Sequence, residues 1–510
     1  MTATASTAHG AADRTTLRAA ARDPYVRGIA AITLLAAVIR FAVIGIPSFW
    51  PDEAFTINIL DGSLSHALHT IPDTESTPPL YYLIAWGWAK VFGTSEEGVR
   101  SLSALCGVLT VPVVAAAATR LADRRTGLVA ALLMATNPFL IWFAQEARAY
   151  ALLVLLAAIG FQFFVRFLDT GDRRALVWWA VASALLLSTH YYGVLMVGAE
   201  AVWLVAAARP GTRGRVVGAI AAVGAVGLAL VPLILKQRHN EFATPPAENA
   251  STFLRAIQVP KQFVVGFDAP AETLLAVVCL ALVVAGLALV VVRRTPQERE
   301  RLYPAAFVGV VVLVIPMLLG AAGYGFVSAR YEVAAMVPLA ICVAAGLAAP
   351  KARLGPVLTA LLVGIWLGIV VAVAADPLLQ TRGDWRNAAE SLGPPPPGGR
   401  AIVVSPASGG PSMRLYLPGA TPITTPYVSV SQIDVMTVRT SKDESLGKIA
   451  AAPGAPKPGL PPSFSECGRK KTRTYMIVRY CSNGPVAVAV NVFGGLRLDD
   501  LTWVALQQRG

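Results

Sequence analysis

Long apolar runs separated by short polar loops dominate the chain between residues 26 and 375. A helix needs about 20 mostly apolar residues to cross the hydrocarbon core of a bilayer, where its backbone hydrogen bonds must be satisfied internally. The pattern therefore predicts about 11 membrane-spanning helices. The first run lacks a clear cleavage site, so we expect it to be retained rather than removed as a signal peptide. The predicted spans are 26–46, 99–120, 126–144, 149–168, 175–189, 191–208, 216–235, 272–292, 304–322, 331–349 and 355–375.

The positive charges in the loops indicate how these helices are oriented. Cytoplasmic loops of membrane proteins are enriched in lysine and arginine. The apolar segment 78–93 is short, and counting it as a span would place all the later basic clusters outside the cell, so we predict an interfacial helix there. With a cytoplasmic N-terminus, every basic cluster falls in the cytoplasm: Arg120, Arg124 and Arg125; Arg166, Arg173 and Arg174; Arg209, Arg213 and Arg215; Arg293, Arg294, Arg299 and Arg301; Lys351 and Arg353.

The chain loses its membrane-like pattern after residue 375. Segment 384–392 has a helical pattern, whereas 401–406, 474–481 and 485–493 are rich in residues that favour strands. We therefore predict an all-α polytopic membrane protein with a small extracytoplasmic α/β domain. The predicted regions are a disordered cytoplasmic N-terminus at 1–24, a transmembrane domain at 25–375 with its first outer loop at 47–98, and the soluble domain at 376–510.

Composition supports this division. The 510 residues are 55% hydrophobic and 14% charged, whereas a soluble domain has about 25% charged residues. The net charge of +13 is distributed over the loops without a basic tract interleaved with aromatics, so we expect no nucleic-acid partner. Cys467 and Cys481 lie in the polar tail, and an extracytoplasmic location favours a disulfide between them. The remaining cysteines, expected to be small buried hydrophobes, are Cys106, Cys279 and Cys342.

Two adjacent carboxylates directly follow the first predicted span. Asp52 and Glu53 occur in the sequence Trp-Pro-Asp-Glu-Ala-Phe. At a membrane surface, paired carboxylates are costly unless they have a task. One can act as a general base toward an acceptor hydroxyl, and the other can orient it or bind a divalent cation. The alternative is that Asp52 caps the following helix, since acidic residues are favoured in a first helical turn.

Two arginines stand at the outer ends of predicted spans. Arg148 follows Glu146 between the third and fourth spans, and Arg330 opens the tenth. An arginine can bind a phosphate through two parallel hydrogen bonds. The alternatives are an internal ion pair between Glu146 and Arg148, and an Arg330 side chain that extends to the lipid headgroups.

Aromatic residues accompany these charges on the same predicted face. His190 and Tyr191 lie at the outer end of the fifth span, and Tyr81 and Tyr82 follow a Thr-Pro-Pro-Leu segment. They are candidate substrate-binding residues. The alternatives are a packed histidine and an aromatic belt at the membrane interface. Carboxylates, arginines and aromatics that converge at one membrane surface suit a reaction on a lipid-linked phosphate substrate.

The ordered motifs WPDEAF, TPPLYYLIAWGWAKVFG, QEARAY, HYY and ARY, with Arg100 in RSL, resemble those of the GT-C superfamily of glycosyltransferases. They are most similar to the family 39-like group, which includes protein O-mannosyltransferases and lipid A aminoarabinose transferases, over about residues 26–350. The resemblance implies a GT-C fold and a polyprenyl-phosphate-linked sugar as donor. It further implies that Asp52 is the catalytic base beside Glu53, and that Arg148, Arg330 and Arg100 bind the donor phosphate. Thr77 replaces a residue that is often basic in this family.

These observations predict an inverting transferase in a bacterial plasma membrane. Mannose is the expected sugar, with arabinofuranose, galactofuranose or an aminosugar as alternatives, and the acceptor is a glycan, lipid or protein outside the cytoplasm. The main alternative is a transporter or flippase for a lipid-linked glycan, which would carry sites near the bilayer midplane in repeated halves. A scaffold that binds through its tail is a further alternative.

Overall fold

The computed structural model describes residues 22–238, 251–324, 327–380, 382–440, 446, 459–499 and 501–510. The predicted N-terminal segment lies outside the described residues up to residue 21. The chain forms two compact units. The helical unit comprises Met1–Ala42, Ser63–Gly93 and Gly98–Val370, and the mixed unit comprises Val43–Gly62, Thr94–Glu97 and Val371–Gly510.

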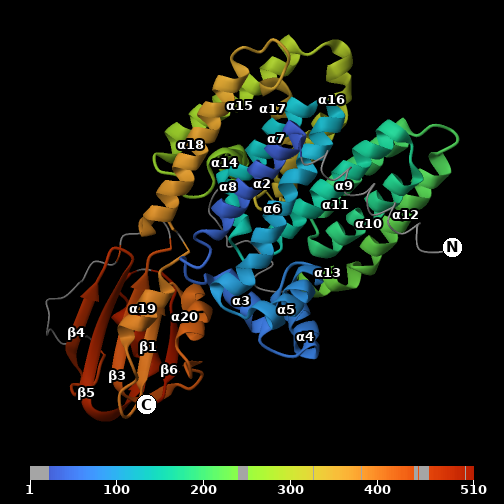
Figure 1. The fold of residues 1–510 in the computed structure, drawn as a ribbon. Coiled ribbons are helices and arrows are strands. Elements are labelled where there is room, and N and C mark those ends of the chain that lie inside the picture. Colours follow the sequence, from blue (N-terminus) through green and yellow to red (C-terminus); the bar gives the residue numbers. More distant parts are fainter. Residues whose placement is uncertain are drawn as a thin grey trace, which may run out of the picture. The chain divides into compact units, whose positions relative to one another are not determined.

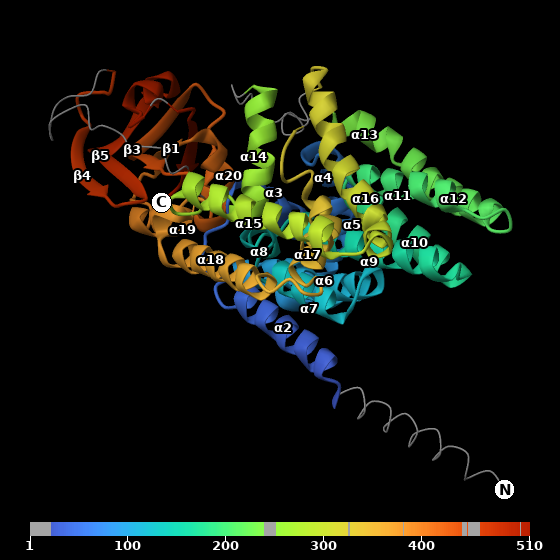
Figure 2. The same cartoon turned by 90° about the horizontal axis from the view of Figure 1, so that it is seen from above.

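The helical unit carries the apolar runs (Figure 1). Within it, α9, α10, α11 and α12 pack against one another, and α15 packs against α14 and α17 (Figure 2). Its elements are α2 (Pro24–Phe41), α4 (Leu64–Thr74), α5 (Leu80–Phe92), α6 (Glu96–Leu121), α7 (Arg124–Thr136), α8 (Pro138–Ala144), α9 (Tyr150–Thr170), α10 (Arg173–Thr189), α11 (Gly193–Ala207), α12 (Arg213–Ala229), α13 (Val231–Gln237), α14 (Thr252–Val265), α15 (Glu272–Arg293), α16 (Pro296–Ala321), η2 (Val333–Ala335), α17 (Met336–Leu347) and α18 (Gly355–Ala375).

Among the described residues, seven helices are long and apolar enough to cross a membrane, or eight if a bent pair counts as one span. The multi-pass helical architecture is therefore confirmed. Each of the predicted ranges contains a helix, but α10, α11 and α17 are shorter than a bilayer-spanning helix. The number of about 11 spans stays a prediction. The apolar segment 78–93 forms α5, which has 13 residues.

The predicted span 126–144 is broken rather than continuous. Helices α7 and α8 meet at a 59° bend around Asn137 and Pro138. Proline cannot continue the hydrogen-bond ladder, and the residue before it is restricted to extended conformations. Arg40 satisfies the carbonyl groups that end α7: its Nη2 donates to Met134 O at 3.0 Å and its Nη1 to Ala135 O at 2.8 Å. The buried Arg40 side chain thus stabilises the bend between α7 and α8.

The mixed unit is built on a six-stranded sheet in the order β2-β6-β1-β3-β5-β4. Strand β1 runs parallel to β3, and the other neighbours are antiparallel. Helices α19 and α20 pack on one face of this sheet, and η5 packs on the other. The elements are α3 (Pro51–Leu60), η3 (Pro377–Leu379), α19 (Trp385–Leu392), β1 (Arg400–Ser405), η4 (Ala407–Gly409), α20 (Gly410–Tyr416), β2 (Thr421–Pro422), β3 (Tyr427–Val438), β4 (Ser465–Lys471), β5 (Tyr475–Ala489), η5 (Val490–Leu496) and β6 (Val504–Gln508).

A disulfide joins the two outermost strands at one edge of the sheet. Cys467 in β4 and Cys481 in β5 are bonded, with their Cα atoms 5.8 Å apart. The other cysteines are free and buried: Cys106, Cys279 and Cys342.

Candidate active site

A buried ion pair lies at the centre of the polar residues of the helical unit. Arg148 occupies the turn between α8 and α9, and Glu75 ends α4. Arg148 Nη1 lies 3.0 Å from Glu75 Oε2, and it also donates to Oε1 at 3.1 Å. The side chains are 11% and 2% exposed, respectively. A charge removed from water in this way is tolerated because its partner is close and hydrogen-bonded.

Tyr82 in α5 completes this cluster. Its hydroxyl donates to Glu75 Oε2 at 2.5 Å, and Thr77 Oγ1 lies 3.0 Å from the same hydroxyl. The guanidinium of Arg148 lies 5.8 Å from the centre of the Tyr82 ring. Burial, reinforced by the Glu75 carboxylate, raises the pKa of Tyr82 well above its usual value. Tyr82 is therefore a neutral hydrogen-bond donor that helps to hold Glu75.

Gln237, at the end of α13, connects the Tyr82 segment to the turn between α10 and α11. Its Nε2 donates to Thr77 O at 3.1 Å and to Ile71 O at 3.3 Å. Its Oε1 accepts a hydrogen bond from the Tyr191 hydroxyl at 2.6 Å. These contacts bring Tyr191 into the network that contains Tyr82.

His190 is buried in the turn between α10 and α11. Burial, together with the positive charges of Arg148 and Arg330, lowers the pKa of His190 to about 3, so the ring is neutral. Its Nδ1 accepts a hydrogen bond from Tyr192 N at 3.2 Å, which leaves the ring proton on Nε2. This Nε2 has no hydrogen-bond partner among the described residues. The site therefore contains a buried donor in the field of two arginines.

The remaining predicted residues of the helical unit are also largely removed from solvent. The Tyr81 hydroxyl lies 3.5 Å from Ser103 Oγ, which donates to Arg148 O at 3.4 Å. Arg100 in α6 and Glu146 in the Arg148 turn are buried, and Arg330 before η2 is half-buried. Contacts thus connect the predicted residues Tyr81, Tyr82, Arg148 and Tyr191, and Arg148 and Arg330 both act electrostatically on His190.

Asp52 and Glu53 belong to the mixed unit, in the first turn of α3. The helix is capped by Trp50, whose backbone N–H donates to Glu53 Oε2 at 3.4 Å. The capping carboxylate is therefore Glu53, which is fully buried, and not Asp52 as the sequence alternative had it. Asp52 is half-buried in the same turn.

The segment that precedes α3 is held by residues of the C-terminal domain. The Tyr416 hydroxyl accepts a hydrogen bond from Phe49 N at 2.7 Å and donates to Glu96 Oε1 at 2.6 Å. Arg386 forms an ion pair with the same carboxylate, and its backbone N–H donates to Ser48 Oγ at 3.1 Å. Residues from α19 and α20 thereby fix the backbone just before Asp52.

Sequence reasoning missed Glu75, Gln237, Arg386 and Tyr416. Glu75 stands two residues before the Thr77 segment, and the need of a buried arginine for a counter-charge is the signal that could have found it. Gln237, Arg386 and Tyr416 act through contacts between segments far apart in the chain, for which the sequence offers no comparable signal. Among the described residues, no group of three or more His, Cys, Asp or Glu could hold a metal ion.

The profile of a family described as dolichyl-phosphate-mannose-protein mannosyltransferase matches residues 76–235, which include Tyr82, Arg148 and His190. The crystal structure of ArnT from Cupriavidus metallidurans bound to undecaprenyl phosphate superposes with a TM-score of 0.53 at 14% identity, over 88% of this chain and 97% of that chain. The chain therefore has the fold of ArnT, a glycosyltransferase of the GT-C superfamily.

Two further GT-C structures are similar over smaller shares of their length. The Saccharomyces cerevisiae Pmt1-Pmt2 complex bound to its sugar donor matches with a TM-score of 0.35 and 17% identity, over 43% of this chain and 35% of that chain. The arabinosyltransferase EmbB from Mycobacterium smegmatis matches with a TM-score of 0.43 and 12% identity, over 94% of this chain and 64% of that chain. No curated protein sequence matches the chain.

Proposed function

We propose that this chain is a GT-C glycosyltransferase, which transfers a sugar from a polyprenyl-phosphate-linked donor to an acceptor hydroxyl outside the cytoplasm, with inversion at the anomeric carbon. The observation that carries the proposal is the buried cluster of Arg148, Glu75 and Tyr82, beside a neutral His190 whose Nε2 lacks a protein partner among the described residues. Such a cluster suits a site that receives an oxygen-rich anion from outside the protein.

The arginines would stabilise the leaving group. As the bond between the anomeric carbon and the phosphate oxygen breaks, its electron pair stays on the lipid phosphate, and fixed positive charge there lowers the barrier. A guanidinium carries five N–H donors in a rigid fork, so Arg148 can be oriented by Glu75 and also bind a phosphate. Arg330 and Arg100 are proposed to add positive charge, while Tyr81 and Tyr191 shape the site around the donor.

Asp52 is the proposed general base. Its carboxylate takes the proton from the acceptor hydroxyl while the acceptor oxygen attacks the anomeric carbon, and one displacement inverts that centre. The cap formed by Glu53 and the contacts of Tyr416 and Arg386 hold the start of α3, so Asp52 is presented from a fixed first turn. A divalent cation beside Asp52 and Glu53 is not required by this scheme.

Mannose is the proposed sugar, because the matching family is described as a mannosyltransferase; arabinofuranose, galactofuranose or an aminosugar are the next choices. We further propose that the N-terminus is cytoplasmic and that the mixed unit lies outside a bacterial plasma membrane. The basic loops and the disulfide between Cys467 and Cys481 support this orientation, since disulfides persist in oxidising compartments.

Donor binding tests the proposal. Full-length protein in nanodiscs is titrated with undecaprenyl phosphate, and its affinity is compared with that of Arg148→Ala and of the control Arg120→Ala. Arg120 forms an ion pair with Asp169 in which the side chains are 31% and 59% exposed, respectively. Losing a charge-assisted hydrogen bond to phosphate should weaken binding about tenfold or more, whereas the control should bind normally. Equal affinities of the two variants would contradict the proposed donor site.

A further inference from the structure

The mixed unit contains an open polar groove of about 420 Å³ between α19 and the end of the β4–β5 hairpin. Neither the donor site nor the segment before α3 uses it. Its lining combines two carboxylates, one ammonium group, one amide and four hydroxyl groups. The lining residues are Asp384, Asn387, Glu390, Ser391, Lys470, Thr472, Thr474 and Tyr475.

The sequence of α19 explains why this groove is polar. One face of the helix is apolar and packs on the sheet through Trp385, Ala388, Ala389 and Leu392. The groove residues Glu390 and Ser391 lie three and four residues after Asn387, which places both beside Asn387 on one side of the helix. The polar side of α19 therefore faces the hairpin across the groove.

Hydrogen bonds across the groove hold its lining in place. Asp384 Oδ2 accepts a hydrogen bond from Thr474 Oγ1 at 2.7 Å. Ser391 Oγ accepts one from Lys470 Nζ at 2.7 Å and lies 2.7 Å from the Tyr475 hydroxyl. These contacts tie the helical wall to the hairpin wall.

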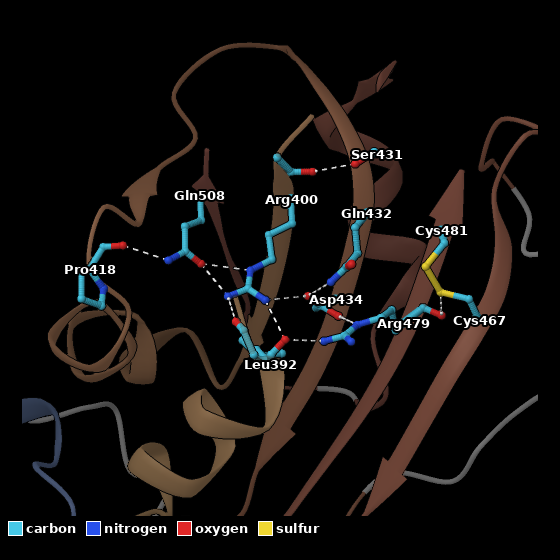
Figure 3. A network of polar contacts seen from close by, with 12 residues as sticks. Leu392, Arg400, Pro418, Ser431, Gln432, Asp434, Cys467, Arg479, Cys481 and Gln508 are labelled. Carbon is cyan, nitrogen blue, oxygen red and sulfur yellow. Dashed lines mark hydrogen bonds and ion pairs between the residues drawn. A yellow bond between two sulfur atoms is a disulfide. The ribbon is translucent and has the colours of Figure 1, made fainter. Parts of the chain in front are cut away.

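A network of hydrogen bonds and ion pairs around Arg400 fixes the helical wall (Figure 3). Arg400 Nη1 and Arg479 Nη2 both donate to the carbonyl of Leu392, the last residue of α19, at 2.9 and 2.7 Å. Asp434 is a counter-charge shared by the two arginines: its Oδ1 accepts from Arg479 Nε at 2.7 Å, and its Oδ2 lies 3.7 Å from Arg400 Nη1. The carbonyl at the end of the helix is satisfied, and the helix is anchored to two strands of the sheet.

The disulfide fixes the other wall. Cys467 and Cys481 link β4 to β5 beside Arg479, as Figure 3 shows, and the same two strands carry Lys470 and Tyr475 into the groove. A site whose lining is held before the ligand arrives loses less conformational entropy on binding. Both walls of the groove are therefore held in place by contacts within the protein.

The lining chemistry selects one class of ligand. The lining contains both hydrogen-bond donors and acceptors, which matches the hydroxyl groups of a sugar, each of which both donates and accepts. Two carboxylates disfavour a phosphate or an acidic peptide, and the polar lining offers little to an apolar ligand. We propose that this groove binds a neutral saccharide and holds the glycan acceptor of the transferase; its role as acceptor site rests on the proposed function, whereas saccharide binding does not.

Saccharide binding by the full-length protein in nanodiscs tests this inference. Saturation-transfer-difference NMR is recorded with a neutral manno-oligosaccharide, a neutral arabino-oligosaccharide and an acidic oligogalacturonide. At least one neutral probe should bind, and Glu390→Gln and Lys470→Met should each weaken it about tenfold. Lys471→Met is the matched control, because Lys471 neighbours Lys470 in β4 but does not line the groove.

Absence of neutral-probe binding, preference for the acidic probe, or equal binding by Lys470→Met and Lys471→Met would overturn the inference. Sugar transfer from the lipid-linked donor is measured separately on the same preparations. A protein that binds saccharide but transfers no sugar would contradict the proposed function and leave the groove assignment intact. A protein that transfers sugar while binding neither neutral probe would overturn the groove assignment alone.

Discussion

Replacing Glu75 with glutamine removes the negative charge beside Arg148 while keeping the size of the side chain. The two charges are 3.0 Å apart, and at an effective dielectric constant of about 20 they attract by about 5–6 kcal/mol. Desolvation offsets part of this, and breaking one side of a buried pair costs about 3–5 kcal/mol. Because the amide oxygen introduced by Glu75→Gln would still accept a hydrogen bond from Tyr82, we expect a loss near the lower end of that range, about 3 kcal/mol.

The chain supplies a matched control two residues before Glu75. Asp73 in α4 forms an ion pair with Lys236 at 2.7 Å, and these side chains are 63% and 55% exposed. An exposed pair contributes about 1 kcal/mol or less, so Asp73→Asn should unfold almost like the wild type. The assay is thermal and denaturant unfolding of the purified protein in one detergent, monitored by tryptophan fluorescence. If Glu75→Gln and Asp73→Asn are equally stable, the ion pair of Glu75 does not hold the site together.

Two other variants probe the mixed unit. Tyr416→Phe removes the hydroxyl between Phe49 and Glu96 and leaves a backbone donor unsatisfied, at a cost of about 1–3 kcal/mol; turnover should fall while donor affinity stays unchanged, and equal turnover would exclude a positioning role. Cys467→Ser opens a short loop and should cost about 3 kcal/mol of stability. Thiol titration of the unfolded, unreduced wild type should find the three free cysteines; two more thiols would show that Cys467 and Cys481 are not bonded.

The apolar runs predicted where helices lie, because a segment that crosses lipid must be helical and about 20 residues long. They did not predict where a helix breaks. The range 126–144 appears continuous in hydropathy, although Asn137 and Pro138 carry the local signal for the bend. Strand β3 was missed, because Tyr427–Val438 mixes polar and apolar residues, and β5 joins two strands that were predicted separately.

The candidate site was predictable by residue type but not by pairing. Arginines and tyrosines at the ends of apolar runs pointed to Arg148 and Tyr82, whereas their shared partner Glu75 lies 73 residues from Arg148. Likewise, the sequence analysis assigned the outer loop 47–98 and the tail 376–510 to different regions. In the structure, Val43–Gly62 belongs to the same compact unit as the C-terminal domain, and Arg386 N donates to Ser48 Oγ. No rule of residue spacing relates segments more than 300 residues apart in the chain.

The transfer rate of Asp52→Asn decides whether this carboxylate is the general base. The asparagine is nearly isosteric, and the cap of α3 is made by Glu53, so the helix start should persist. Full-length wild type, Asp52→Asn and Arg148→Ala are compared in nanodiscs with a saturating radiolabelled polyprenyl-phosphate mannose. Loss of the general base should lower the rate by about 10²–10⁴-fold while donor affinity remains that of the wild type, whereas Arg148→Ala should weaken the donor. Near-wild-type turnover of Asp52→Asn would exclude Asp52 as the general base and assign this role to another carboxylate.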